Sequence, residues 1–344
     1  MDSTLLEIDG SLGEGGGQIL RTSLALSLLT GRPFRLYNIR AGRSKPGLQP
    51  QHLTSVRAAA TIGHAKLRGA SRGSSDLTFE PGEVTAGNYR FDIGTAGATG
   101  LVLQTLYLPL ALRGGGPSHL TLIGGTHVST SPCFHFLDTT WRHYLKLVHL
   151  RLSMEMIRPG FYPRGGGQVE VNIQTSDRLV GLHARERGPI HLSGFSAVVK
   201  VPAHVVKRQA RRARVRLEQQ GLHAEISEQI WHGDSGTVLA IVVHTTPAPV
   251  LCFGLGALHK PAERVADEAI DQVLAYVRAA PAAVDAHSAD QLVLPLAMAE
   301  GPSEYTVAEV TPHLTTNIAV IRRFLEREIV CEGREGKPGV VRVE

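Results

Sequence analysis

The sequence predicts a mixed α/β fold in which a unit of the βαβαββ type occurs three times. Segments with helix and strand periodicity follow one another in the same order three times along the 344 residues, and the GGGQ at residues 15–18 recurs at residues 165–168. A stretch of different character, with strand and helix signals of its own, lies at residues 183–279. We therefore expect a large domain, with two repeats at residues 1–182 and the third at residues 280–344, interrupted by a smaller inserted α/β domain.

The first round begins with a strand and a glycine-rich loop around Glu14, which leads into a leucine-rich helix over residues 18–29. Gly31 ends this helix, because glycine readily adopts the left-handed conformation found at helix C-termini. A second helix opens at Gln51, with Pro50 in its first turn. The strands expected in this round lie at residues 4–8, 34–39, 66–69, 77–80 and 89–93.

The glycine-rich loop does not have the spacing of the common nucleotide-binding loops. The patterns GxxxxGK[ST] and GxGxxG are both absent from the chain, so a nucleotide must be held by other means. Arg21, in the helix that follows, is most simply interpreted as a solvent-exposed residue.

Three cations lie within six residues in the next loop, RAGRSKPG: Arg40, Arg43 and Lys45. A loop held between a strand and a helix can grip a phosphodiester through charge-assisted hydrogen bonds from such side chains. A solvated basic turn is the alternative, and we favour the phosphate-binding interpretation.

The second round begins at GTAGATG, and the third begins near Asp290. In the second round we expect helices from residue 101 and over residues 134–150, and strands at residues 120–123, 154–157 and 169–173. In the third round we expect a helix through Leu296, a strand near Tyr305, a helix after His313, and strands near Ile329 and Val340.

The helix after His313 has an apolar stripe, because Ile318, Ile321 and Leu325 recur at helical spacing. We expect it to begin at Thr315 or Thr316, whose hydroxyl groups can cap the free N–H groups of its first turn.

His313 would then lie at the mouth of that helix, where the N–H groups and the helix dipole form an anion site that suits a phosphate. The positive helix end would also keep the imidazole neutral, as attack on phosphorus requires. The alternative is that His313, one of 16 histidines, only finishes a loop.

The inserted stretch has strand signals at residues 190–201 and 238–243 and helix signals at residues 203–219 and 262–277. The segment 207–216 of its first helix contains six basic residues and no acidic one. This basic face either contacts RNA or is simply solvated, and the lack of interleaved aromatic residues favours the second interpretation.

The composition is that of a globular protein, with 42% hydrophobic and 19% charged residues. The formal net charge of +5 suits acidic partners such as RNA or nucleotides but does not identify them. Three cysteines without a CxxC pair argue against a disulfide framework or a zinc site and favour a reducing compartment. Residues 1–11 lack the basic start of a signal peptide, and the longest apolar run is far shorter than a membrane span. We expect a cytoplasmic protein that does not associate with membranes.

Four motifs occur in this order along the chain: GEGGGQILR, RAGRSKPGLQPQH, HSADQLVLPLA and HLTTN. As a set they make the chain resemble the RNA 3'-terminal phosphate cyclase family, and the resemblance extends over nearly the whole sequence. The resemblance implies three repeated βαβαββ-type units with a smaller domain inserted before the third. It also implies an ATP-dependent reaction that converts an RNA 3'-phosphate into a 2',3'-cyclic phosphodiester and releases AMP and pyrophosphate.

The resemblance makes His313 the nucleophile, which would attack the α-phosphorus of ATP and hold AMP as a phosphoramidate. The AMP would then pass to the RNA 3'-phosphate, and the neighbouring 2'-hydroxyl would close the ring and expel AMP. Gln104 matches the family's adenine-site glutamine, and Pro132 matches a proline that lines the nucleotide pocket.

Further matches to the nucleotide site lie together in the third repeat: His287, Ser288, Ala289, Asp290 and Gln291. His287 replaces a residue that is often tyrosine in the family, although an imidazole can also stack on adenine. The resemblance implies phosphate contacts by Arg21, Arg40, Arg43 and Gln51, and binding of Mg²⁺ or Mn²⁺ by Glu14, because pyrophosphate leaves as a neutralised group.

Other functions stay open at this point. The chain could be a catalytically inactive, cyclase-like protein that binds RNA or assists ribosome assembly, and the presence of His313 argues against this. An enolpyruvyl transferase would have no use for His313, and a plain RNA-binding module would show salt-sensitive binding without ATP turnover. An exposed sheet edge would let two copies pair as a homodimer, but the sequence does not determine the oligomeric state.

Overall fold

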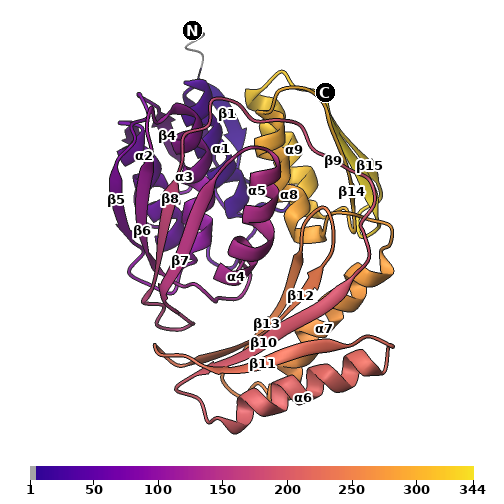
Figure 1. Cartoon of the computed structure of the whole chain (residues 1–344). Coiled ribbons are helices and arrows are strands. Elements are labelled where there is room, and N and C mark those ends of the chain that lie inside the picture. Colours follow the sequence, from indigo (N-terminus) through magenta and orange to yellow (C-terminus); the bar gives the residue numbers. More distant parts are fainter. Residues whose placement is uncertain (1–4) are drawn as a thin grey trace.

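The computed structural model describes residues 5–344, whose arrangement is shown in Figure 1. It confirms the mixed α/β fold, because four four-stranded sheets alternate with helices along the chain. The strand expected at residues 4–8 is observed as β1 (Leu6–Asp9), and residue 4 lies outside the described residues. Among the described residues, no helix has both the length and the apolar character needed to cross a bilayer.

Three of the four sheets share one layout. In each, the first two strands are parallel, and the fourth strand lies between the second and the third and is antiparallel to both. In chain order, these sheets contain β1, β2 (Phe34–Tyr37), β3 (Lys66–Arg68) and β4 (Leu77–Glu80); β5 (Asn88–Asp92), β6 (Ser118–Gly124), β7 (Leu152–Arg158) and β8 (Gly167–Ile173); and β9 (His183–Ala184), β14 (Ser303–Val307), β15 (Ile329–Gly333) and β16 (Gly339–Val343). The shared layout supports the predicted repeat.

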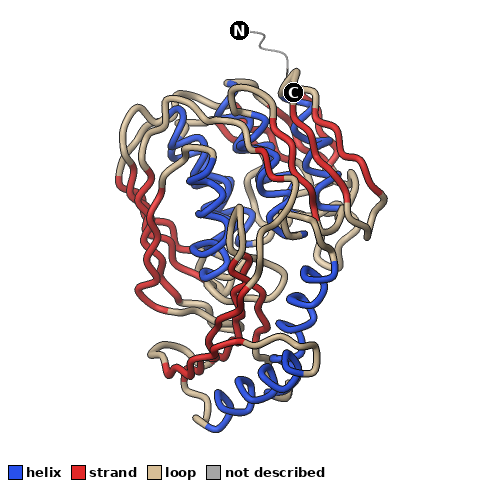
Figure 2. Tube along the Cα trace, turned by 45° about the vertical axis from the view of Figure 1, so that its right-hand side comes forward, coloured by secondary structure: helices blue, strands red, loops and turns tan. Residues whose placement is uncertain are grey.

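The helices of these units lie between the sheets, as Figure 2 shows. They are α1 (Gly17–Thr30), α2 (Pro50–Ile62), α3 (Thr99–Arg113), α8 (Ala286–Ala297) and α9 (Pro312–Phe324). Helix α1 packs against α2, α3 and α9, and α8 packs against α9. Between Gln18 and Leu29, every residue of α1 except Arg21 is buried. A helix that is buried on all sides belongs at the centre of the domain, so the partly buried arginine in it is unusual, and Arg21 is not the solvent-exposed residue expected from the sequence.

The helix expected at residues 134–150 is interrupted. It consists of α4 (Phe134–Phe136), a π-helical turn (Leu137–Trp141) and α5 (Arg142–Leu147). A π-helical turn widens the backbone spiral locally. Here it contains Trp141, a fully buried side chain whose ring packs edge-on against Tyr107 of α3.

The fourth sheet has a different strand order, β11-β10-β12-β13, and lies below the other three in Figure 1. Its strands are β10 (His191–Val199), β11 (Ala224–Ile230), β12 (Gly236–His244) and β13 (Val250–Leu255), and its helices are α6 (His204–Glu218) and α7 (Ala262–Arg278). A separate cluster of buried apolar side chains joins this sheet to both helices. Strands β11 and β13 were not expected from the sequence.

The first residues of the predicted insert pair with the third sheet, because His183 and Ala184 form β9 parallel to β14. Strand β9 is therefore the first strand of the third unit, and the fourth sheet follows it in the chain. The domain boundaries themselves stay a prediction.

Candidate active site

His313 lies within the first turn of α9. The helix begins at Pro312, and the hydroxyl of Thr311 accepts a hydrogen bond from the Leu314 N–H over 3.2 Å. The prediction that Thr315 or Thr316 would start the helix was therefore wrong, because an earlier threonine supplies the N-terminal capping bond and proline follows it at the first helical position. The histidine is part of the helix and its side chain projects from the N-terminal turn.

The imidazole of His313 is held by α1. Its Nδ1 lies 2.8 Å from Oε1 of Gln18, and 3.6 Å from Oε1 of Glu14 in the glycine-rich loop. Its Nε2 has no hydrogen-bond partner in residues 5–344. Burial lowers the pKa of His313, while Glu14 raises it and Arg21 lowers it. Partial burial is the largest cause of this lowering of the pKa, and it favours the neutral ring.

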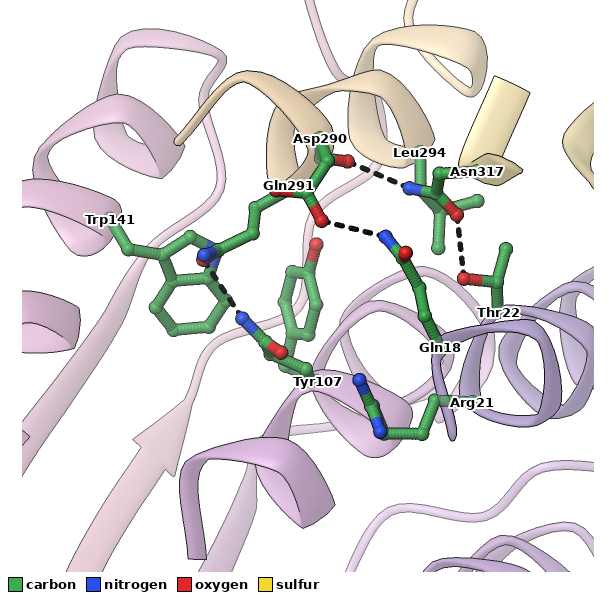
Figure 3. Close-up of a pocket in the computed structure, with 10 residues that line it drawn as sticks. Gln18, Arg21, Thr22, Tyr107, Trp141, Asp290, Gln291, Leu294 and Asn317 are labelled. Carbon is green, nitrogen blue, oxygen red and sulfur yellow. Dashed lines mark hydrogen bonds between the residues drawn. The ribbon is translucent and has the colours of Figure 1, made fainter. Parts of the chain in front are cut away.

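A polar network continues from Gln18 into the two neighbouring helices (Figure 3). Gln18 Nε2 donates to Oδ2 of Asp290 over 2.6 Å, and Asn317 Nδ2 donates to the main-chain oxygen of Asp290 over 2.7 Å. The hydroxyl of Thr22 donates to Asn317 Oδ1 over 2.7 Å. These bonds connect α1, α8 and α9, so the position of the imidazole is set by three helices of the core.

Burial raises the pKa of Asp290 to about 7, and the nearby Arg21 opposes that shift. Arg21 makes no hydrogen bond to any described residue. Burial lowers its pKa to about 10, and Asp290 and Glu14 act in the opposite direction. A desolvated guanidinium without a hydrogen-bonded partner is a strong attractant for an anionic ligand.

A cavity of about 970 Å³ opens beside His313, at the upper end of the size range of ligand sites. The predicted site residues that line it are Arg21, Gln104, Pro132, His287, Asp290, Gln291 and His313. The first and the last of these residues, Arg21 and His313, are more than 290 positions apart in the sequence. The whole set nevertheless comes together where α1, α3, α8 and α9 meet. Ser288 and Ala289 are buried within α8 and do not line the cavity.

Two amide side chains face each other on the cavity wall. Gln104 Nε2 donates to Gln291 Oε1 over 2.8 Å, and Gln291 Nε2 donates to the main-chain oxygen of His287 over 2.8 Å. This leaves Oε1 of Gln104 as an unused acceptor for a ligand. Helix α8 is oriented by Asp285, whose carboxylate accepts from the N–H groups of His287 and Ser288.

Sequence reasoning missed the far wall of the cavity. Part of this wall comes from the β7–β8 loop, with Tyr162 and Pro163, and part from β13, α7 and the loop between them, with Phe253, Leu255, Leu258, Lys260, Glu268 and Gln272. The most exposed large apolar side chains of the described chain are Leu258, at 87%, and Tyr162, at 77%, and both lie on this wall. Their residue types carry no motif, and only the packing of the fourth sheet against the helices could have identified them.

The remaining predicted residues lie outside the cavity lining. Arg43 forms an ion pair with the carboxylate of Glu14 and donates to its main-chain oxygen over 2.9 Å, so both lie beside His313. Arg40 donates to the main-chain oxygens of Lys45 and Gly47, and Gln51 Oε1 accepts from the Ala98 N–H over 2.7 Å. Arg40 and Gln51 thus hold loops together in this structure.

Comparison with known proteins identifies the family. The sequence model described as RNA 3'-terminal phosphate cyclase matches residues 12–331, which include His313 and the fourth sheet. The chain belongs to the RNA 3'-terminal phosphate cyclase family. The identification of this family from sequence motifs, and of the chain as one of its enzymes, is confirmed.

Individual cyclases are similar over nearly their full length. The RNA 3'-terminal phosphate cyclase of Caldivirga maquilingensis is 46% identical over 333 residues, which cover 94% of each chain. The cyclase of Ectopseudomonas mendocina is 44% identical over 348 residues, covering 100% of this chain and 99% of that protein. Among solved structures, EPSP synthase from Acinetobacter baumannii aligns with 99% of this chain and 65% of its own, at 11% identity and a TM-score of 0.27, which is too low to indicate a common fold.

Proposed function

We propose that the protein converts an RNA 3'-terminal phosphate into a 2',3'-cyclic phosphodiester at the expense of ATP, through a covalent His313–AMP intermediate. The observation that carries the proposal is the state of His313. Its Nδ1 is occupied by Gln18, and its Nε2 is left without a protein partner, in a ring that lines the cavity. A neutral imidazole nitrogen with a free lone pair is the nucleophile that attack on phosphorus needs.

The walls of the cavity suit an adenosine nucleotide. The free Oε1 of Gln104 can accept from the exocyclic amine of adenine, and Pro132 and His287 offer flat surfaces to the ring. Arg21 lines the same cavity and has no hydrogen-bonded partner among residues 5–344, and a phosphate oxygen would supply one. These features support ATP as the ligand.

In the first step, His313 Nε2 forms a bond to the α-phosphorus, the bond between the α-phosphorus and the bridging oxygen breaks, and pyrophosphate leaves. In the second, an oxygen of the RNA 3'-phosphate displaces the imidazole and takes AMP. In the third, the ribose 2'-hydroxyl loses its proton and attacks the 3'-phosphorus, which closes the ring and expels AMP. Adenylylation is needed because a phosphate monoester has no good leaving group of its own.

The residues present fit a divalent ion that is held largely by the nucleotide. The described residues contain no group of three His, Cys, Asp or Glu side chains that could form a protein cage for a metal. Mg²⁺ commonly binds through one or two carboxylates together with substrate phosphates, and Glu14 is the carboxylate nearest to His313. Glu14 would hold Mg²⁺ or Mn²⁺ there, where the ion would neutralise phosphate charge.

The test is covalent labelling with ATP that carries a label on its α-phosphate. The purified protein, with a divalent ion, is denatured and separated on a gel beside His313→Ala. We expect a labelled band that is acid-labile, alkali-stable and absent from the variant. The label should then transfer to RNA that ends in a 3'-phosphate but not to RNA that ends in a 3'-hydroxyl. A folded wild-type protein that binds RNA yet takes up no label would refute the proposal and favour an inactive RNA-binding relative.

A further inference from the structure

Two hydrogen bonds in series connect a carboxylate to the imidazole of His313. Gln18 donates from Nε2 to Asp290 Oδ2 over 2.6 Å, and its Oε1 lies 2.8 Å from His313 Nδ1. Gln18 is only 6% exposed, so water competes little with these two partners for its amide. The sequence had marked Gln18 only as part of a glycine-rich repeat, and the proposed reaction assigns it no role.

The chemistry of these groups determines which atom donates and which accepts in each of the two hydrogen bonds. An ionised carboxylate has only acceptor atoms, and a carboxamide donates at its nitrogen and accepts at its oxygen. The ionised form of Asp290, which predominates above its pKa of about 7, therefore turns the amide nitrogen of Gln18 toward itself and leaves the amide oxygen for His313. Since that oxygen can only accept, the imidazole proton lies on Nδ1 and the lone pair lies on Nε2.

Other charged groups lie near these two hydrogen bonds, but none takes the place of Gln18 as the partner of His313 Nδ1. Glu14 Oε1 lies 3.6 Å from Nδ1, which is beyond hydrogen-bond distance. Arg21 of α1 favours the ionised form of Asp290, and burial and Asp285 at the start of α8 disfavour it. Asn317 of α9 fixes the main chain of Asp290, so the carboxylate cannot turn away easily.

We propose that Gln18 and Asp290 are a pair of positioning residues that holds His313 in the Nδ1–H tautomer and leaves Nε2 free to attack phosphorus. The catalytic consequence rests on the proposed function, whereas the tautomer rests on the hydrogen bonds alone. The proposal also gives Asp290 a role other than base recognition, because its Oδ2 is committed to Gln18.

The Asp290→Asn variant tests whether Asp290 determines which end of the Gln18 amide faces His313. Unlike an ionised carboxylate, an asparagine amide can donate to Gln18 Oε1, and in that orientation the Gln18 amide turns round and presents its N–H groups to His313. The proton then moves to Nε2 and the nucleophilic lone pair is lost. We expect covalent adenylylation to slow on the order of 10²-fold or more, as when a histidine in another enzyme is held in the wrong tautomer, while the dissociation constant of ATP changes little.

A second substitution should restore the direction. In Asp290→Asn with Gln18→Glu, the new carboxylate accepts both from the Asn amide and from His313 Nδ1–H, so the adenylylation rate should recover substantially. Asp177→Asn, at an exposed position without an ion pair among the described residues, is the matched control and should leave the rate unchanged. Equal rates in wild type and in an Asp290→Asn protein whose His313 carries its proton on Nε2, or no recovery in the double variant, would overturn the proposal.

The tautomer can be measured without any reaction. NMR of the imidazole nitrogens in the ATP-free protein, with the signals of His313 identified by their absence from His313→Ala, should show Nδ1–H in the wild type and the double variant, and Nε2–H in Asp290→Asn. An Nε2–H tautomer in the wild type would disprove the proposal, even if the enzyme adenylylates. An Nδ1–H tautomer in a protein that takes up no label would instead refute the proposed function and leave the positioning pair intact.

Discussion

Arginines on two helices of this protein have opposite surroundings. Arg212 of α6 donates to Asp267 of α7 over 2.8 Å, whereas Arg21 of α1 has no hydrogen-bonded partner among residues 5–344. The other ion pairs between α6 and α7 are Arg208–Glu263, Arg216–Asp267 and Arg216–Asp271. A charge that is paired within the chain serves the fold, and a desolvated charge without a partner is available to a ligand. The density of basic residues along the sequence therefore points to α6, whereas the lack of a partner points to Arg21.

Among the substitutions proposed for these two regions, replacement of Arg21 should reduce the adenylylation rate the most. Arg21→Ala removes the cavity cation that we assign to a phosphate, so the adenylylation rate should fall by about 10²-fold, the usual cost of removing one preorganised donor. Arg21→Lys keeps the charge but not the planar fork, and we expect an intermediate rate. Single-turnover labelling at saturating ATP measures both variants.

The matched substitution is Arg212→Ala, which removes a paired arginine that does not line the cavity. Its adenylylation rate should equal that of the wild type. If both arginine variants slow the reaction equally, unpaired charge is not what distinguishes the two sites.

The next largest effect is expected at Asp290, because its buried carboxylate lowers the stability of the folded protein. Burial raises its pKa to about 7 from an ordinary value of 3.8, so the folded state holds a proton that the unfolded state releases as the pH rises. Stability is therefore lost progressively between those two pKa values and stays lost above pH 7. We expect Asp290→Asn to gain stability relative to wild type between pH 5 and pH 8, by an amount on the order of 1 kcal/mol. Urea unfolding at the two pH values measures this, and a constant difference between the proteins would contradict it.

The comparison of Arg21 with the arginines of α6 also shows which features could be predicted from the sequence. Apolar periodicity predicted most helices and strands of the three similar units, and motif matches brought Gln104, Asp290, Gln291 and His313 to one cavity. Periodicity could not show that the N–H groups of α9 are capped by Thr311, since three threonines stand close to His313. A count of charges could not separate the arginines of α6 from Arg21, because the partners of α6 lie about 55 positions further along the chain.

The far wall of the cavity also could not be predicted from the sequence. The wall that Tyr162 and Leu258 complete depends on how a loop of the second unit and a loop of the fourth sheet approach each other. Neither loop has a pattern that encodes this approach. Gln18 was hidden for a related reason, since its role depends on Asp290 and His313, which lie 272 and 295 positions away.

A smaller effect is expected when the paired region itself is disturbed. Asp267→Asn weakens the contacts to Arg212 and Arg216 at once, but these groups are partly exposed and solvent screens them. The midpoint of thermal unfolding should fall by about 2 °C or less, and adenylylation should not change. A loss of activity in a folded Asp267→Asn protein would show that the α6–α7 pairs also support the cavity.

The smallest effect is expected at the two cations of the basic segment that remain unpaired within the described residues, Lys207 and Arg211. Both are exposed to water, unlike Arg21, so their lack of a partner carries no desolvation cost and does not signal a ligand. We expect Lys207→Ala with Arg211→Ala to bind RNA as the wild type does, with the same dependence of log K on log salt. If α6 did contact RNA phosphates, the loss of two contacts would reduce that slope by about 1.4, at about 0.7 for each contact with a single strand. A reduced slope would thus mean that exposure and charge are sufficient for RNA binding, and that burial is a criterion for the nucleotide site only.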